Sequence, residues 1–572
     1  MTEEKRLEAV VDNLLAEASA NGPGALAAAR RAAALADGRD GVRAQKALAI
    51  AARLDPLDPF ARLGLSRLAA EAGDLEDARL QAAQVFAQSV DEAARARAAF
   101  ILGELARAQG RSAEAREAYT AAARIEDGLL QGDRSDVAAA RWYARALGRV
   151  AELDVETDPV GARNVAEGVV AMLRALTTQV GEPPALAADI ADAEFRLAVL
   201  DLDFGMPTAA RRRLNEAIGR YEALCVAEPG EPHWRGVLAE SQALMAEAAF
   251  ALGDGAAARV AMDKALKLRV KLATVDPAER WALAGAWRVR AALLENLGDM
   301  NEAADCLMHA RALAKQLRAE ATEADEAPAR FLAHTLMEQA DLAMRRDALE
   351  EARDAADEAR MLAEPFARTA NTSTTWRADL AAAWSRLGAI AGRANAPAPA
   401  LDAFSRAAEL RRQARDADRD DANAARALAA ALVQMGEAAL ATRALDTARN
   451  AFSESLGLRL ELAENAPGAL EPARDLAIAM ERVGLVAAAM GDRQGARMMW
   501  EEEFAVLDRI FEDPTDVEGQ RMRAVVEAHL ASLGGMDAQE RRASALARLD
   551  ILAEDGVLTA RDTALRKQLW QA

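Results

Sequence analysis

Residues 376–408 read WRADLAAAWSRLGAIAGRANAPAPALDAFSRAA, and this stretch decides how the whole chain is interpreted. Leu380, Trp384 and Leu387 recur four and three positions apart, so they share one face of a predicted helix. The proline-containing segment 395–399 then breaks that helix, because proline lacks an amide donor and restricts the residue before it. A second apolar stripe follows. The stretch therefore predicts two helices folded back on a short turn.

The same turn recurs along the chain, in variants such as GDLEDA, GRSAEA and GDMNEA, and its last residue is an alanine. These alanines are Ala78, Ala115, Ala162, Ala210, Ala258, Ala303, Ala352, Ala400, Ala448 and Ala496. Their numbers differ, in order, by 37, 47, 48, 48, 45, 49, 48, 48 and 48. An alanine-rich chain without repeats would not hold this register. A period near 48 leaves room for two helices of about 20 residues each, so we expect an all-α chain of repeated helix pairs.

The repeats resemble the tetratricopeptide repeat (TPR) family. In the opening stretch the matching residues are Trp384, Leu387, Gly388, Ala391, Ala400, Phe404 and Ala407. Partial matches elsewhere include Gly103 with Tyr119, Gly436 with Phe452, and Gly484 with Trp500. The resemblance implies antiparallel helix hairpins that stack into a superhelical α-solenoid. The usual repeat of the family has about 34 residues, so this chain would be a long-repeat variety.

Three regions are expected along the chain. Residues 1–58 would form N-terminal helices or a cap, residues 59–512 a solenoid of about ten helix pairs, and residues 513–572 a C-terminal helical cap. An exposed solenoid end needs such a polar-backed cap. The repeat is most degenerate around residues 127–175, and a hinge there stays open.

Composition excludes several classes of function. The chain has 572 residues, 52% of them apolar, and a net charge of −20, which opposes binding to nucleic acids or anionic membranes. Two cysteines cannot form a disulfide framework and suit a reducing compartment. The N-terminus is amphipathic and acidic, unlike a signal peptide, and no uninterrupted apolar run is long enough to span a membrane. We therefore expect a cytoplasmic protein that neither crosses nor binds a membrane.

Motifs that carry chemistry are nearly absent. The four histidines form no zinc spacing, and Cys306 with His309 would share a helix face without further ligands nearby. No phosphate-binding loop, nucleophile elbow or dinucleotide fingerprint is present. Residues 211–213 are three arginines, but consecutive helical positions point about 100° apart and cannot all face one ligand. We expect no catalytic residues, no metal and no cofactor.

Tryptophans mark the joints between predicted hairpins. Trp234, Trp281 and Trp376 open three first helices at similar distances from the turn, so we expect them to fill the joint between neighbouring hairpins. A stacking site for a ligand is the alternative. Trp384 is expected to be a buried core residue whose loss would destabilise its repeat.

The TPR resemblance implies that the first helix of each pair lines a concave groove that binds a peptide or a partner helix. The positions carried over as exposed groove residues are Arg288, Glu295, His334, Met337, Asp341, Arg386, Arg393, Gln434 and Glu437. Methionine beside both charge signs favours a protein ligand over a small polar substrate. The Lys/Asn clamp that some chaperone-binding members use for acidic tails is not evident.

These observations favour a non-enzymatic scaffold or adaptor that binds a protein or peptide partner. A ligand-responsive regulatory or sensory TPR protein is the alternative. An enzyme would need a deep pocket with convergent polar groups and shifted acids. The identity of the partner, the biological process, the oligomeric state and the pitch of the superhelix stay open.

Overall fold

A computed structural model describes residues 3–20, 22–36, 40–322, 325–368, 374–513 and 515–571. Within these ranges the regular structure consists of 26 α-helices and one short 3-10 helix, with no strand. The all-helical prediction is confirmed. The turn residues Gly38 and Arg39 and the helix stop at Pro514, all singled out in the sequence, lie outside the described residues.

The chain divides into two compact units, residues 1–279 and 280–572, and each is described by itself. Unit 1 begins with three helices, and five helix pairs follow. Its helices are α1 (Glu3–Ser19), α2 (Ala25–Ala36), α3 (Gly41–Leu54), α4 (Pro59–Glu71), α5 (Leu75–Gln88), α6 (Glu92–Ala108), α7 (Ser112–Gly132), α8 (Val137–Asp154), α9 (Pro159–Val180), α10 (Pro184–Asp203), α11 (Pro207–Ala227), α12 (Pro232–Ala251), α13 (Gly255–Val275) and the 3-10 helix η1 (Pro277–Glu279).

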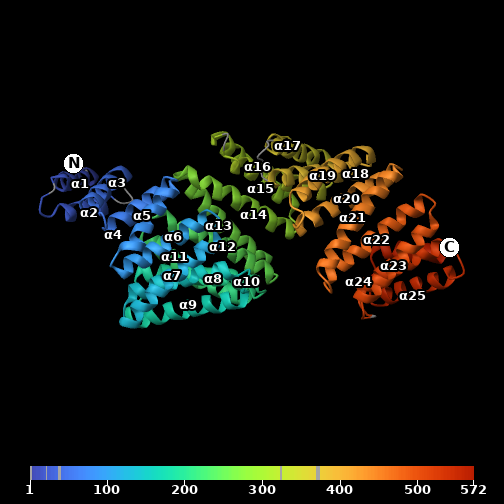
Figure 1. Cartoon of the computed structure of the whole chain (residues 1–572), viewed down its shortest axis with the longest axis horizontal. Coiled ribbons are helices and arrows are strands. Elements are labelled where there is room, and N and C mark those ends of the chain that lie inside the picture. The colour runs from blue at the N-terminus through green and yellow to red at the C-terminus, as the bar shows by residue number, and fades with distance from the viewer. Residues whose placement is uncertain are drawn as a thin grey trace. The chain divides into compact units, whose positions relative to one another are not determined.

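Unit 2 continues the alternation with six helix pairs and one last helix. Its helices are α14 (Arg280–Asn296), α15 (Met300–Glu320), α16 (Ala327–Arg345), α17 (Leu349–Ala367), α18 (Thr374–Arg393), α19 (Pro397–Ala417), α20 (Ala422–Ala441), α21 (Leu445–Asn465), α22 (Leu470–Ala489), α23 (Arg493–Ile510), α24 (Val517–Ser532), α25 (Ala538–Glu554) and α26 (Ala560–Gln571). Within each unit a helix packs mainly on the helices before and after it in sequence, as Figure 1 shows. The fold is a TPR-like helical repeat.

The recurring alanine marks the start of each second helix. At all ten predicted positions the alanine is the fourth residue of that helix, and it is buried. Its amide donates the first hydrogen bond of the helix, as Ala258 does to the carbonyl of Asp254 at 3.0 Å. A larger side chain would separate the two helices, because the methyl group is packed where the return helix first meets its partner. The predicted register is confirmed at every position.

A glycine–aromatic contact holds four of the helix pairs together. Gly103, Gly388, Gly436 and Gly484 on first helices face the rings of Tyr119, Phe404, Phe452 and Trp500, always at the same sequence separation, on the second helix. A Cβ atom built on Gly436 would lie 2.5 Å from the Phe452 ring. The ring therefore occupies the space of the missing side chain, which offsets the roughly 1 kcal/mol that a glycine costs in a helix.

In nine of the ten pairs marked by the recurring alanine, the short turn uses a residue in the left-handed conformation two positions before the second helix, and the α8–α9 turn does not. Glycine supplies it in most pairs, as at Gly253 with φ 77°, and an aspartate then caps the next helix, as Asp254 does by accepting from the amide of Ala257. Asp347, Asn395 and Arg443 take the same conformation with φ between 55° and 61°, which is unfavourable for residues with a Cβ atom.

The predicted joint tryptophans differ in their environments. Trp376 is fully buried, stacks on Phe366 with ring centroids 4.4 Å apart, and donates from Nε1 to Glu326 at 2.6 Å, so it fills the joint between α16, α17 and α18. Trp281 is 39% exposed, although its ring lies 5.0 Å from that of Phe331 on α16.

Trp234 is half-buried, donates from Nε1 to Glu228 at the end of α11 at 2.7 Å, and packs against a core cluster that includes residues of α10 and α11, so it lies at the joint between neighbouring hairpins. The expectation for Trp384 is corrected. Trp384 is not a fully buried core residue: it is half-buried, and the guanidinium groups of Arg360 and Arg406 lie 5.1 and 4.6 Å from its ring centre. These two cations and the partial exposure accompany its apolar contacts with the cluster around Trp376.

One described helix, α20, is long and apolar enough to cross a membrane by length and composition. The core helix of a soluble protein meets the same criterion. Leu428 and Leu432 of α20 are buried against α19 and α21, and alanines fill most of its remaining contacts. Its apolar character is therefore accounted for by packing within unit 2.

Candidate functional site

The nine predicted groove residues lie on first helices of unit 2, as expected, but most of them are committed to neighbouring repeats. Arg288 on α14 binds Glu338 on α16 at 2.8 Å, and Asp341 on α16 binds Arg386 on α18 at 2.7 Å. Glu295 pairs with Arg345 in the same way. These contacts join residues 45 to 50 apart in sequence, so they link equivalent helices of adjacent repeats.

The pattern continues along the unit. Arg393 of α18 binds Asp347 at 2.7 Å and the carbonyl of Met344 at 2.6 Å, and Glu437 of α20 binds Arg482 of α22 at 3.1 Å. We call this series of inter-repeat ion pairs the ladder. Gln434 is exposed. Each exposed pair contributes only about 0–1 kcal/mol, so the ladder fixes the register of the repeats more than it stabilises them.

Two of the predicted groove residues on α16 are less exposed than expected: His334 is half-buried and Met337 is buried. His334 Nε2 lies 3.0 Å from Asp379, which also accepts from Arg330 at 2.8 Å. Burial disfavours the ionised Asp379 carboxylate, but these two hydrogen bonds outweigh burial and lower its pKa. Met337 is 7% exposed and belongs to the core between α16, α17 and α18. The expectation that Met337 is exposed is wrong, because the helix turns this position onto α18 rather than toward solvent.

Unit 1 contains a cavity of about 450 Å³ that sequence reasoning did not find. Its base is apolar and comes from three helices: Ala144 and Ala151 of α8, Val169 and Leu173 of α9, and Leu200 of α10. Small alanines on α8 face larger residues on α9, which leaves space between α8 and α10. An apolar concave surface of this size suits an inserted side chain or a small ligand.

Charged residues surround the apolar base. Five lining carboxylates, Glu152, Glu156, Asp189, Asp192 and Asp203, stand against two lining guanidinium groups, Arg145 and Arg196. The rim of the cavity is therefore acidic. We call the apolar base and this rim together the unit 1 cavity.

Ion pairs hold parts of the rim in place. Asp189 has a nearly inaccessible side chain and accepts from Arg145 at 2.7 Å and also from Arg141. Arg196 binds Glu152 across the cavity mouth at 2.9 Å. Burying a carboxylate is unfavourable unless it is paired, so Arg141 and Arg145 account for the position of Asp189.

Tyr221 fixes one further rim residue. Its hydroxyl donates to Asp192 at 2.5 Å, and burial, reinforced by that carboxylate, raises the pKa of the Tyr221 phenol well above its usual value. The phenol therefore stays protonated and remains a donor at all physiological pH values. The hydrogen bond therefore holds the Asp192 side chain in place at the rim.

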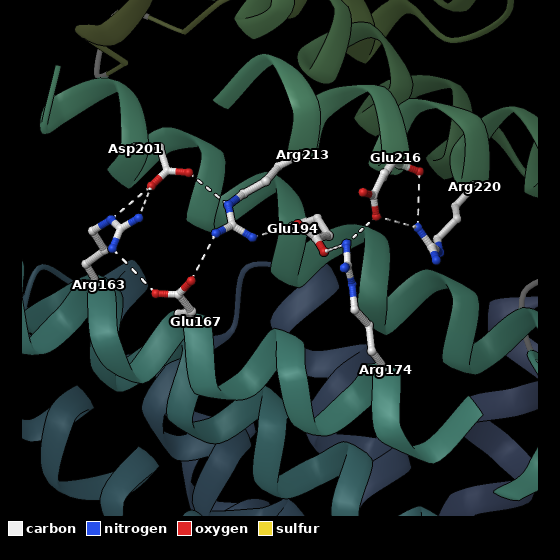
Figure 2. Close-up of polar contacts among 8 residues, drawn as sticks. All are labelled: Arg163, Glu167, Arg174, Glu194, Asp201, Arg213, Glu216 and Arg220. Atoms are coloured by element: carbon white, nitrogen blue, oxygen red, sulfur yellow. Dashed lines mark hydrogen bonds and ion pairs between the residues drawn. The ribbon is translucent and has the colours of Figure 1, made fainter. Parts of the chain in front are cut away.

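A buried charge network sets the angle between α9, α10 and α11 next to the cavity. Arg213 reaches Asp201 at 2.8 Å and Glu194 and Glu167 at 3.4 Å, while Arg163 binds Asp201 at 2.8 Å. These contacts are drawn in Figure 2. Both Glu194 and Asp201 are inaccessible to solvent. Arg174 joins Glu194 to Glu216 and extends the network along α11.

The network also explains the run of three arginines at 211–213. Arg213 is buried, whereas Arg211 and Arg212 are exposed on other faces of α11. Only one of the three thus enters the network, as the helical spacing of about 100° requires. The acids and arginines of this network form ion pairs with one another, so the network acts as a structural clamp between the three helices.

Cys306 and His309 do not come together around a common ligand. The Cys306 thiol is buried, and Arg290 lies 3.1 Å from its sulfur, while His309 stacks on Trp287 with centroids 4.5 Å apart. Burial raises the pKa of the Cys306 thiol. Among the described residues no group of three or more His, Cys, Asp or Glu side chains is arranged to hold a metal ion.

Comparison with known proteins gives similarity of fold. No protein-family model matches the chain, and no curated protein matches it. Similar solved structures include BtubC (BKLC) from P. vanneervenii, with 18% identity over 45% of this chain and 92% of that chain and a TM-score of 0.36. The apo form of RapI has 10% identity over 54% and 100% of the two chains, with a TM-score of 0.36.

Yeast Tom70 has 14% identity over 92% of this chain and 99% of its own, with a TM-score of 0.34. At these identities the likeness concerns the helical fold alone.

Proposed function

We propose that the chain is a non-enzymatic protein that binds a protein or peptide partner, and that the unit 1 cavity is its main anchor point. The observation that carries this proposal is an apolar recess of about 450 Å³ enclosed by an acidic rim. A buried apolar anchor surrounded by a polar rim is the usual arrangement at protein–protein interfaces.

The chemistry of the cavity indicates which side chains of a partner it would bind. The apolar base accepts a Leu, Met or Phe side chain, whose burial contributes about 1.5–3 kcal/mol. The acidic excess of the rim favours lysine or arginine residues on either side of that anchor. A net charge of −20 on the chain acts in the same direction, because it accelerates association with a basic partner.

Unit 2 carries candidate partner contacts of its own, separate from the unit 1 cavity. Arg393, Gln434 and Glu437 are exposed on α18 and α20, and they are the predicted groove residues best placed to meet a partner. The half-buried members of the ladder, such as Arg386, would contribute to partner binding indirectly, because their ion pairs align neighbouring repeats. The two free cysteines, Cys225 and Cys306, fit the proposed cytoplasmic location.

A peptide-display selection against the full chain tests the proposal. Selected peptides should share one large apolar residue flanked by lysine or arginine, and Val199→Trp should abolish their binding because the indole fills the cavity from α10. Val160→Trp is the matched control, since Val160 is 59% exposed on α9 and does not line the cavity. Selected peptides that bind both variants equally, or that share no basic flank, would refute this assignment.

The alternative, a ligand-responsive regulatory protein, is supported by a second cavity in unit 2. Under this alternative, a small molecule should stabilise the chain against thermal unfolding in the absence of any protein partner.

A further inference from the structure

A larger cavity, about 870 Å³, lies at the C-terminal end of unit 2 between α22, α23, α24 and α26. We call it the C-terminal cavity. Its apolar walls come from three of these helices: Ile478, Leu485, Met522, Val525 and Leu565 line it. The cavity is large enough for a drug-sized molecule or for a long side chain of a partner.

Three polar groups on the cavity wall are buried without full hydrogen bonding. Glu503 on α23 is only 2% exposed, and its Oε2 has no hydrogen-bond partner among the described residues. Within the same part of the chain, Nδ1 of His529 on α24 and Nε of Arg482 on α22 are likewise buried and unpartnered. A buried polar atom without a partner loses its hydration and gains nothing in return, which is unfavourable. Two of these atoms, Glu503 Oε2 and His529 Nδ1, can accept a hydrogen bond from a ligand, whereas Arg482 Nε can only donate one.

The charges around the cavity do not balance internally. Arg482 is paired with Glu437 at 3.1 Å, Arg521 with Asp562 at 2.9 Å, and Glu518 with Arg474 at 3.3 Å. Of the lining charges that the structure describes, Glu481 and Glu503 then face a single exposed guanidinium, that of Arg561. The excess charge in the C-terminal cavity is therefore negative whenever Glu503 is ionised.

The protonation states follow from this environment. Burial, reinforced by the neighbouring Glu481 charge and only partly offset by Arg482, raises the pKa of Glu503 to about 9. Burial also raises the pKa of Glu481, although Arg482 and Arg561 oppose the shift. His529 stacks on Trp500 with ring centroids 4.9 Å apart, and burial, with Arg482 nearby, lowers its pKa to about 4. At neutral pH the free cavity thus presents a neutral carboxyl and a neutral imidazole.

We propose that the C-terminal cavity binds an organic cation, a primary amine or guanidinium on an apolar stem, between the carboxyl groups of Glu503 and Glu481. The stem contacts Ile478, Leu485 and Val525 on the apolar walls. The neutral imidazole of His529 offers one acceptor nitrogen to a ligand N–H. With Glu503 ionised, an anion would meet two carboxylates and, among the lining residues described, one guanidinium outside the ion pairs, so this form of the cavity favours a cation.

Binding of a cation is coupled to loss of a proton. A cation pairs best with the ionised carboxylate, so Glu503 gives up its proton as the ligand enters. Affinity should therefore rise between pH 7 and pH 9, by up to about ten-fold per pH unit. The same cation can come from a free amine or from a lysine or arginine side chain of a partner protein.

Isothermal titration calorimetry on the full chain tests the proposal with three probes: spermidine, agmatine and N-acetyl-lysine methylamide. At least one probe should bind, with the predicted pH dependence and with proton release detected as a buffer-dependent enthalpy. Binding of the lysine derivative alone identifies a partner side chain, whereas binding of spermidine or agmatine alone identifies a free amine. Both results support the cation site.

Glu503→Gln is the decisive variant, because glutamine has the shape of the protonated acid and cannot ionise. It should fold as the unaltered chain does, as judged by its thermal midpoint at pH 7, and bind the probe at least about ten-fold more weakly. Glu502→Gln is the matched control, since the neighbouring Glu502 is exposed and does not line the cavity. The proposal is overturned if no probe binds, if Glu503→Gln binds as tightly as the unaltered chain, or if acetate or inorganic phosphate binds in place of the cations. None of these outcomes depends on the unit 1 cavity.

Discussion

At the scale of single residues, the paired helices pack tightly where a glycine of the first helix meets an aromatic ring of the second helix. Phe452 is fully buried against Gly436, and the ring has no room to move aside for a methyl group. The contact therefore makes the smallest possible side chain a requirement at this position.

Gly436→Ala should therefore destabilise unit 2 by about 1–3 kcal/mol through overpacking, despite the better helix propensity of alanine. Gly457→Ala on α21 is the control with the opposite sign, because a Cβ atom there meets open space. It should stabilise the helix by about 0.5–1 kcal/mol. Urea unfolding followed by circular dichroism measures both. A Gly436→Ala protein as stable as the Gly457→Ala protein would show that the ring is not a fixed neighbour.

The buried Glu503 carboxyl makes the folding stability of the chain decrease as pH rises. Its pKa is about 9 in the folded chain, above its ordinary value of 4.5, so the folded state holds the proton more tightly and stability falls as pH rises from 4.5 to 9. Glu126, with burial raising its pKa to about 7, acts in the same direction up to pH 7. His529, with a pKa of about 4, acts in the opposite direction below pH 6.5.

Between pH 7 and 9 the Glu503 contribution should be the main one. The free energy of unfolding should drop by about 2 kcal/mol across this interval in the unaltered chain, and Glu503→Gln should flatten the decline. Urea midpoints at three pH values measure the effect. Parallel profiles for the two proteins would exclude Glu503 as the group responsible.

Two tryptophans test the distinction between a core residue and a half-buried one. Trp376→Ala should destabilise unit 2 by about 3–5 kcal/mol, because a fully buried indole, its stacking on Phe366 and its hydrogen bond to Glu326 are all lost. Trp384→Ala should have a smaller effect, since its ring is half-buried between two arginines. Equal losses in chemical unfolding would restore the assignment of Trp384 to the core.

At the scale of elements, the turns between paired helices repeat one geometry with unequal sequences. Arg443 adopts φ 60° where other pairs have glycine. Arg443→Gly should stabilise the α20–α21 pair by about 0.5–1 kcal/mol, because the left-handed conformation is strained only for residues with a Cβ atom. Gly253→Ala is the reverse exchange and should destabilise α12–α13. Thermal midpoints of the two variants should move in opposite directions, and any shift in the same direction contradicts the shared geometry.

The helix pairs could be predicted from the sequence because their causes are local. The alanine at the start of each second helix, the Gly-Asp turn and the glycine at a constant distance before an aromatic ring all act within one hairpin, and each lies where it was predicted. The ladder could also have been predicted, because opposite charges such as Asp341 and Arg386 are separated in sequence by about one repeat.

The two cavities could not be predicted in the same way. Each depends on which side chains leave space between three or four helices, as the small Ala144 and Ala151 do beside Leu173. Likewise, the protonated state of Glu503 depends on burial by α22 and α24, which no pattern within α23 reveals. The ion pairs that several predicted groove residues make with the next repeat were missed for a related reason, because they depend on how equivalent helices lie beside one another.

At the scale of the molecule, charge shapes the proposed partner binding. A net charge of −20 and an acidic cavity rim predict that long-range attraction contributes to the affinity for basic peptides. Raising the salt concentration from about 0.05 M to about 0.5 M should weaken binding of selected peptides several-fold, because ions screen exposed charges. A peptide that keeps the apolar anchor but replaces its basic flanks with serine is the control and should lose this salt dependence. Fluorescence anisotropy measures both, and salt-insensitive binding of the basic peptide would refute the electrostatic contribution.

The fixed interval between glycine and ring has a consequence for how the gene can change in length. Inserting one codon between Gly436 and Phe452 would either lengthen the tight turn or rotate the ring about 100° away from its glycine. Duplicating or deleting a complete module leaves every interval intact. Natural variants of this chain are therefore expected to differ in size by whole modules, with single-codon gains and losses confined to the connections between them.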